Sequence, residues 1–171
     1  MDLPEEPTVH EATTEDARTI ASLIRRSFRR QVEILQLRRS ECPEYVGFET
    51  ADRVRRRMQR GDHVLVADLA GRLVGTVAFG GVAGDSPKGE IARLAVLPPY
   101  RGKGLGQVLM QAAETALGQF GATVAEVGIV AKFDRLRSYY EALGYTITRR
   151  QRFDALPFEV LFMEKRIASG T

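Results

Sequence analysis

The chain has 171 residues, of which 44% are hydrophobic and 27% are charged, a composition typical of a soluble globular domain with a buried core. No apolar run approaches the ~20 residues that span a bilayer, and residues 1–7 lack the basic start and apolar centre of a secretory signal. Cys42 is the only cysteine, which excludes an internal disulfide and a cysteine-based zinc site and favours a cytoplasmic location. We therefore expect a single domain over residues 1–171, with residues 1–7 as a flexible tail, no metal and no membrane partner.

Arginine is concentrated in one stretch of an otherwise weakly basic chain, whose net charge is +3. Between Ile24 and Arg60 there are eleven arginines and five acidic residues. Two interpretations stay open: the arginines form solvated helix faces, or they form a basic rim on a binding groove. Aromatic residues are not interleaved with them, which argues against a nucleic-acid partner.

The first half of the chain predicts a strand and two helices. Residues 8–12 form the strand, and Thr13 or Thr14 caps the first helix. Apolar residues then recur at helical spacing, at Ala17, Ile20, Leu23, Ile24 and Phe28. A looser, arginine-rich segment follows, and Thr50 or Asp52 caps a second helix that ends near Arg60.

The second half predicts strands alternating with helices. A hairpin joins residues 63–68 to residues 72–79, and Gly80, Gly81 and Gly84 mark a loop. The strands and helices that follow are a strand over 90–96, a helix over 104–120, a strand over 123–130, a helix over 133–143 and two strands over 145–153 and 158–166. This order predicts an α/β fold with antiparallel hairpins early and late and strand-helix-strand units between them.

The most informative segment connects the strand over 90–96 to the next helix and reads Val-Leu-Pro-Pro-Tyr-Arg-Gly-Lys-Gly-Leu-Gly from Val96 to Gly106. Its glycines let the backbone turn tightly, and the free N–H groups at the helix start favour an anion such as pyrophosphate. Arg101 and Lys103 add positive charge at its rim. A Walker loop is excluded because Leu105 follows Gly104, and the glycine spacing also departs from the Rossmann fingerprint.

The remaining pattern, Arg101-x-x-Gly104-x-Gly106, resembles the acetyl-CoA-binding motif of the GNAT superfamily of N-acetyltransferases. The run Tyr139-Tyr140-Glu141-Ala142-Leu143-Gly144-Tyr145 is similar to a second signature of that family, and the order of elements over residues 8–166 also resembles it. The resemblance implies a mixed, mostly antiparallel central sheet of six to seven strands, flanked by about four helices, with splayed central strands.

The resemblance also implies where acetyl-CoA binds. The co-substrate would lie in a V-shaped opening between the strands over 90–96 and 123–130, with the pantetheine arm paired to backbone groups of the Leu94, Ala95 and Val96 segment. Backbone N–H groups of the following loop would hold the pyrophosphate; its residues are Arg101, Gly102, Lys103, Gly104, Leu105, Gly106 and Gln107.

The chemistry implied is direct attack of an amine on the thioester. A protonated amine must first lose a proton, and Glu90, with Glu126 or water as alternatives, would accept it. Tyr140 would protonate the departing thiolate. Many family members carry an asparagine seven residues before this tyrosine, where this chain has Phe133, followed by Asp134, so that contact with the coenzyme is expected to be lost or replaced.

Two functions from different classes follow. The first is an active N-acetyltransferase acting on a primary amine, and the second is a non-catalytic acyl-CoA-binding sensor or subunit. The arginine excess favours a small amine that bears an anionic group over a polyamine or a basic peptide, because like charges would repel. The oligomeric state stays open, and a homodimer is compatible with the sequence.

Overall fold

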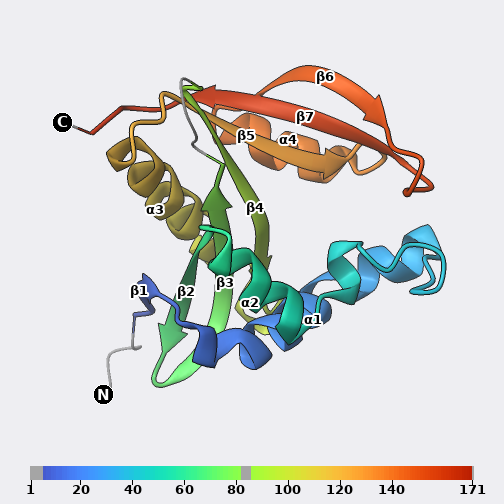
Figure 1. Cartoon of the computed structure of the whole chain (residues 1–171), viewed down its shortest axis with the longest axis horizontal. Coiled ribbons are helices and arrows are strands. Elements are labelled where there is room, and N and C mark those ends of the chain that lie inside the picture. The colour runs from blue at the N-terminus through green and yellow to red at the C-terminus, as the bar shows by residue number, and fades with distance from the viewer. Residues whose placement is uncertain (1–5, 82–85, 171) are drawn as a thin grey trace. The chain divides into compact units, whose positions relative to one another are not determined.

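The computed structural model describes residues 6–81 and 86–170, so residues 1–5 of the predicted tail and Gly84 of the predicted loop lie outside the described residues. Within the described part there are seven strands and four α-helices (Figure 1). In chain order the elements are β1 Thr8–Glu11, α1 Ala17–Leu35, α2 Ala51–Gln59, β2 His63–Leu69, β3 Arg72–Gly80, β4 Lys88–Val96, α3 Leu105–Gln119, β5 Val124–Val130, α4 Asp134–Ala142, β6 Thr146–Arg152 and β7 Glu159–Arg166.

The strands form one sheet in the order β1-β2-β3-β4-β5-β7-β6. The β1–β2, β2–β3, β5–β7 and β6–β7 pairs are antiparallel, whereas β4 and β5 run parallel. The parallel register covers only three residue pairs and ends where Glu90 faces Glu126. The predicted fold, a mixed and mostly antiparallel sheet of six to seven strands with about four helices, is confirmed.

The chain divides into two compact units, which are described separately. The first contains residues 1–79 and 93–113, and the second contains residues 80–92 and 114–171. A single domain over the whole chain therefore stays a prediction.

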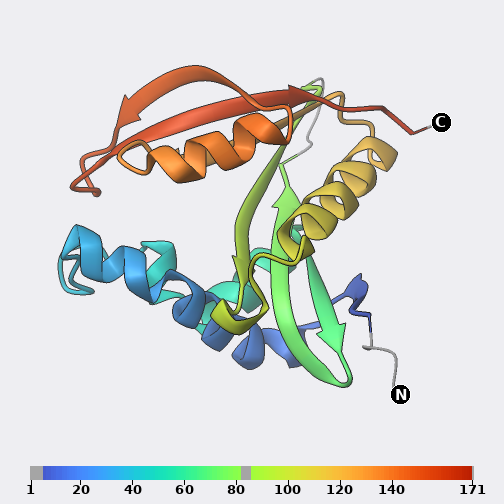
Figure 2. The ribbon, with the colours of Figure 1, turned by 180° about the vertical axis from the view of Figure 1, so that it is seen from behind.

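The core of the first unit lies where α1 and α2 cover one face of β2 and β3 (Figures 1 and 2). Ile20 and Ile24 of α1 pack there with Val54 of α2 and Val64 of β2. These residues leave water because the apolar positions of α1 recur every three to four residues and form one stripe. The opposite face meets α3, where a Cβ added at Gly75 would lie 2.9 Å from Leu109.

The first helix is longer than the sequence predicted. α1 continues to Leu35, through the first part of the arginine-rich segment that was expected to be looser, and it ends where Gln36 adopts a left-handed conformation with φ of +52°. The segment stays helical because Val32 and Leu35 continue the apolar spacing from Phe28, and both side chains are half-buried. The second cap was predicted with two candidates, and Thr50 fills it by accepting the Arg53 backbone N–H at 3.2 Å.

The second unit places α4 beside β5 and β7 (Figures 1 and 2). Tyr145, at the start of the chain's return from α4, is 1% exposed and packs edge-on against Tyr140 with ring centroids 5.8 Å apart. Gly144 permits this turn because its φ is +99°, a conformation that other residues avoid. Across both units, no helix of the described residues is long and apolar enough to cross a bilayer.

Two adjacent residues of α3 test how much the packing against β3 stabilises the fold. Leu109 has no exposed surface, whereas Val108 is 47% exposed. Leu109→Ala should lower the free energy of unfolding by about 2–5 kcal/mol, because it removes buried methyl groups and leaves a cavity. Val108→Ala should change it by less than about 0.5 kcal/mol. Denaturant unfolding of both variants measures the difference, and equal losses would contradict the assigned face of α3.

Candidate functional site

The loop that connects β4 to α3 has the open backbone that an anion site needs. Gly102 and Gly104 have φ of +76° and +81°, and a Cβ added at either would meet no atom within 4 Å. The side of the loop that a side chain would fill is therefore empty. α3 begins at Leu105 and contributes the unpaired N–H groups and positive dipole end of its first turn. A phosphate or pyrophosphate fits this combination.

Arg101 anchors the loop to α1. Its Nε donates to the Val96 carbonyl at 3.0 Å, and its Nη2 donates to the Ser27 carbonyl at 2.8 Å and to Ser27 Oγ at 3.1 Å. The Ser27 hydroxyl also donates to the Val96 carbonyl at 3.3 Å. The guanidinium therefore holds the loop against Ser27 of α1. The sequence did not predict this role, because Ser27 lies 74 residues away.

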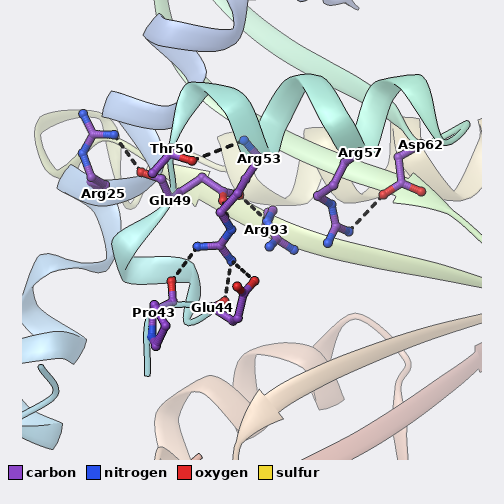
Figure 3. Close-up of polar contacts among 9 residues, drawn as sticks. All are labelled: Arg25, Pro43, Glu44, Glu49, Thr50, Arg53, Arg57, Asp62 and Arg93. Carbon is purple, nitrogen blue, oxygen red and sulfur yellow. Dashed lines mark hydrogen bonds and ion pairs between the residues drawn. The ribbon is translucent and has the colours of Figure 1, made fainter. Parts of the chain in front are cut away.

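The strand segment that leads into the loop begins with a residue in an unusual conformation. Arg93 has φ of +56°, the left-handed region that residues with a Cβ rarely adopt. Its Nε lies 2.5 Å from Oε2 of Glu49, whose side chain has no exposed surface (Figure 3). Leu94, Ala95 and Val96, the residues predicted to pair with the pantetheine arm, follow directly.

Glu49 is the centre of a cluster of arginines (Figure 3). Arg53 lies 3.3 Å from Oε1 of Glu49, and Arg25 donates to the Glu49 backbone carbonyl at 2.7 Å. Arg53 also donates to the carbonyls of Pro43 at 2.9 Å and Glu44 at 2.5 Å.

Sequence reasoning missed this cluster. One signal was available: in a regular strand Arg93 shares the face of Ile91 and Ala95, both buried, and a charge at such a position indicates a bulge or a buried partner.

Tyr140 is a buried phenol on α4 in the second unit. It is 7% exposed, and its ring packs edge-on against Tyr139 and Tyr145, with centroids 5.3 Å and 5.8 Å away. Burial, with a smaller contribution from Tyr139, raises the pKa of Tyr140 well above its ordinary value near 10. The phenol therefore keeps its proton throughout the neutral range, the state that a general acid requires.

The two candidate bases face each other on neighbouring strands of the second unit but differ in surroundings. Glu90 of β4 is exposed and pairs in register with Glu126 of β5. The Glu126 side chain is 13% exposed and forms ion pairs with Lys88 at 3.3 Å and Arg149 at 3.8 Å. Lys88 also pairs with Glu164, and this hydrogen bond is the main cause that raises the pKa of Lys88. Glu126 thus belongs to an ion-pair network.

Three other residues named in the sequence analysis make contacts within the protein. Phe133 caps α4 without a side-chain hydrogen bond, and Asp134 forms an exposed pair with Arg137 at 3.4 Å. Cys42 is buried, its thiol lies 3.5 Å from the Arg38 carbonyl, and burial raises its pKa, which leaves it a poor nucleophile. Among residues 6–81 and 86–170, no group of three or more His, Cys, Asp or Glu side chains could hold a metal ion.

A sequence model described as the acetyltransferase (GNAT) family matches residues 31–145, about two thirds of the chain. The match contains the loop from Arg101 to Gln107 together with Glu90 and Tyr140.

Solved structures with the same fold are numerous. The PaiA N-acetyltransferase of Thermoplasma acidophilum, in complex with coenzyme A, superimposes with a TM-score of 0.76 at 18% identity, covering 94% of this chain and 98% of that one. The ribosomal-protein-S18-alanine N-acetyltransferase of Escherichia coli gives 0.74 at 15% identity and covers 96% of both chains. The yncA protein of Salmonella typhimurium, with its cofactor acetyl-CoA, gives 0.69 at 19% identity, covering 97% of this chain and 96% of that one. At these identities the likeness establishes the fold.

Proposed function

The chain belongs to the GNAT family of acetyltransferases, and on this premise we propose that it transfers the acetyl group of acetyl-CoA to a primary amine on a small molecule. The observation that carries the proposal is the open loop before α3, where Gly102 and Gly104 leave room for a phosphate beside the helix N-terminus. A family of acetyl-CoA-dependent acyltransferases needs such a site for the pyrophosphate of its co-substrate.

The first unit would hold the co-substrate. Backbone N–H groups from Gly102 to Gln107 would bind the pyrophosphate, since the N–H of Arg101 donates to the Pro98 carbonyl at 3.3 Å. Backbone groups of Leu94, Ala95 and Val96 would pair with the pantetheine arm. Acetyl-CoA, when bound, supplies an activated acyl group as a thioester. Arg101 would support this site by holding the loop against Ser27, and Lys103 would add charge at the rim.

Glu90 is the better candidate for the base. An alkylamine has a reference pKa near ~10.4 and attacks only after losing a proton. Glu90 is exposed and can take that proton directly or through water. Glu126, its register partner, is already engaged in ion pairs with Lys88 and Arg149.

Tyr140 is the proposed general acid. A phenol is protonated at neutral pH, so Tyr140 has a proton to donate to the leaving sulfur. This argument does not require a metal or a covalent intermediate on the protein.

The preference for an anionic acceptor loses part of its basis. Arg25 donates to the Glu49 carbonyl, Arg53 contacts Glu44 and Glu49, and Arg57 pairs with Asp62 at 3.0 Å. The preference rested on the arginine excess between Ile24 and Arg60, and these three of its guanidinium groups already have an acceptor within the protein. We therefore propose a small amine as acceptor without requiring an anionic group on it.

The loop assignment can be tested with two glycines of equal backbone strain. Gly104→Val should abolish the stabilisation by acetyl-CoA, which for the parent should reach about 2.7 kcal/mol at 100 times the Kd. Gly71 of the β2–β3 hairpin has φ of +84° and equally open surroundings, so Gly71→Val controls for strain. It should lower the Tm but keep the shift with acetyl-CoA. If Gly104→Val binds coenzyme A as tightly as the parent, the loop assignment is wrong.

Turnover is best followed as free thiol released from acetyl-CoA in the presence of a panel of small amines. Tyr140→Phe should lower kcat by about 10²–10⁴-fold, the usual contribution of a positioned general acid, while the Kd for acetyl-CoA stays unchanged. Tyr139→Phe, on the same helix but 37% exposed, is the matched control and should keep kcat within about threefold. A parent that binds acetyl-CoA but releases no thiol with any amine would instead support the non-catalytic sensor.

The base is identified by the pH dependence of the rate. Glu90→Gln should reduce kcat/KM for the amine mainly at low pH, where unprotonated amine is scarce and the carboxylate matters most. At high pH the free amine attacks without help and the variant should approach the parent. An unchanged profile for Glu90→Gln, together with an altered one for Glu126→Gln, would transfer the role to Glu126.

A further inference from the structure

Arg93 is held in a conformation that its position does not explain. Among the described residues, three that are not glycine have positive φ: Gln36, Ala70 and Arg93. Gln36 ends α1 and Ala70 lies in the β2–β3 turn, both places where the chain must reverse. Arg93 instead lies inside β4, where extended backbone is the rule. Such a conformation persists only where surrounding structure holds it, and it occurs preferentially at ligand sites.

The surrounding structure here is a buried ion pair (Figure 3). The Arg93 side chain is 15% exposed, the Glu49 side chain has no exposed surface, and Arg93 Nε lies 2.5 Å from Glu49 Oε2. A charge-assisted bond of this kind is short and strong, and breaking it would leave a carboxylate away from water with one cation fewer. The pair therefore favours the left-handed conformation of Arg93 over the extended one.

Glu49 has a fixed position because its backbone carbonyl and its carboxylate both contact arginines. The backbone carbonyl accepts from Arg25 of α1 at 2.7 Å, and the carboxylate oxygen Oε1 lies 3.3 Å from Nε of Arg53 of α2. The next residue, Thr50, caps α2. Arg53 is itself held by the carbonyls of Pro43 and Glu44, so it does not move freely with its partner.

We propose that Glu49 is a positioning residue for co-substrate binding, acting through Arg93 on the backbone of Leu94–Val96. By keeping Arg93 left-handed, the pair sets the direction in which the next three residues present their N–H and C=O groups. Apart from the Val96 carbonyl, which already accepts from Arg101 and Ser27, those groups are the ones assigned above to the pantetheine arm, so this inference rests on the proposed function. Glu49, Arg93 and the Leu94–Val96 segment all belong to the first unit.

The decisive comparison is Arg93→Ala against Arg93→Gly, two variants that both lose the ion pair and differ only by a Cβ. Glycine adopts φ of +56° at little cost, whereas alanine does not. Titration calorimetry with acetyl-CoA should therefore give a Kd for Arg93→Ala that is about 5–30 times that for Arg93→Gly. A purely structural role of the ion pair would lower the Tm of both variants and leave the two Kd values equal, which would overturn the proposal.

Glu49→Gln supplies the second arm. It should raise the Kd for acetyl-CoA about tenfold in the parent, yet cause no further change when combined with Arg93→Gly, since glycine no longer needs the carboxylate. Glu44→Gln is the matched control, because the Glu44 carboxylate is 82% exposed and contacts Arg53 weakly, at 3.7 Å. The Kd of this variant for acetyl-CoA should stay within about twofold of that of the parent. Equal effects of Glu49→Gln in both backgrounds would refute the route through Arg93.

The two proposals fail differently. If the parent binds neither acetyl-CoA nor coenzyme A, the proposed function is wrong and the positioning role is wrong with it. If the parent binds and Arg93→Ala equals Arg93→Gly, only the positioning role is wrong. The comparison of the two Arg93 variants tests the need for the left-handed backbone even if Glu49→Gln does not fold.

Discussion

A carboxylate without exposed surface must have its charge balanced by neighbours, because it has lost the water that would otherwise solvate it. Glu49 meets this condition with Arg93 at 2.5 Å and Arg53 at 3.3 Å, and Arg25 binds its backbone carbonyl. Removing one partner of such a pair typically costs about 3–5 kcal/mol, more than the left-handed backbone of Arg93 costs. The charge balance therefore outweighs the local preference of β4 for extended backbone. The contacts of Glu49 also join α1, α2 and β4 just before the strand enters the loop.

The fold followed from the sequence where the determining signals are local. The Thr50 cap, the apolar stripe of α1 and the prolines after Val96 each act within a few residues, and the elements they predict are present. The end of α1 did not follow, because the residue that ends it in a left-handed conformation is Gln36 and not the glycine that usually marks such an end. Val32 and Leu35 are half-buried on the face of Phe28, whereas Ile34 lies off that face and is 46% exposed.

In the candidate site, too, the features with local sequence signals were predicted and those that depend on distant residues were not. The loop glycines were predicted because tight turns and helix starts have local signatures, and their positive φ agrees with that expectation. The contacts of Arg93 and Arg101 were not predicted, since their partners Glu49 and Ser27 lie 44 and 74 residues away in the chain. Charged residues are exposed by default, so nothing in the sequence pairs a particular arginine with a particular buried acceptor. The preference for Glu90 over Glu126 likewise depends on Lys88 and Arg149 being close to Glu126.

The use of arginine rather than lysine in this region has a geometric reason. A guanidinium presents five donors in a rigid plane, so one side chain can serve several acceptors at once, whereas an ammonium is a compact point charge. Arg53 bonds two carbonyls and still reaches the Glu49 carboxylate, and Arg101 bonds the carbonyls of Val96 and Ser27. Arg53 thereby holds the segment that precedes α2, and Arg101 joins its loop to Ser27, 74 residues away. A count of arginines between Ile24 and Arg60 therefore overstates the positive potential that an acceptor would meet, because part of that charge stabilises the protein that binds it.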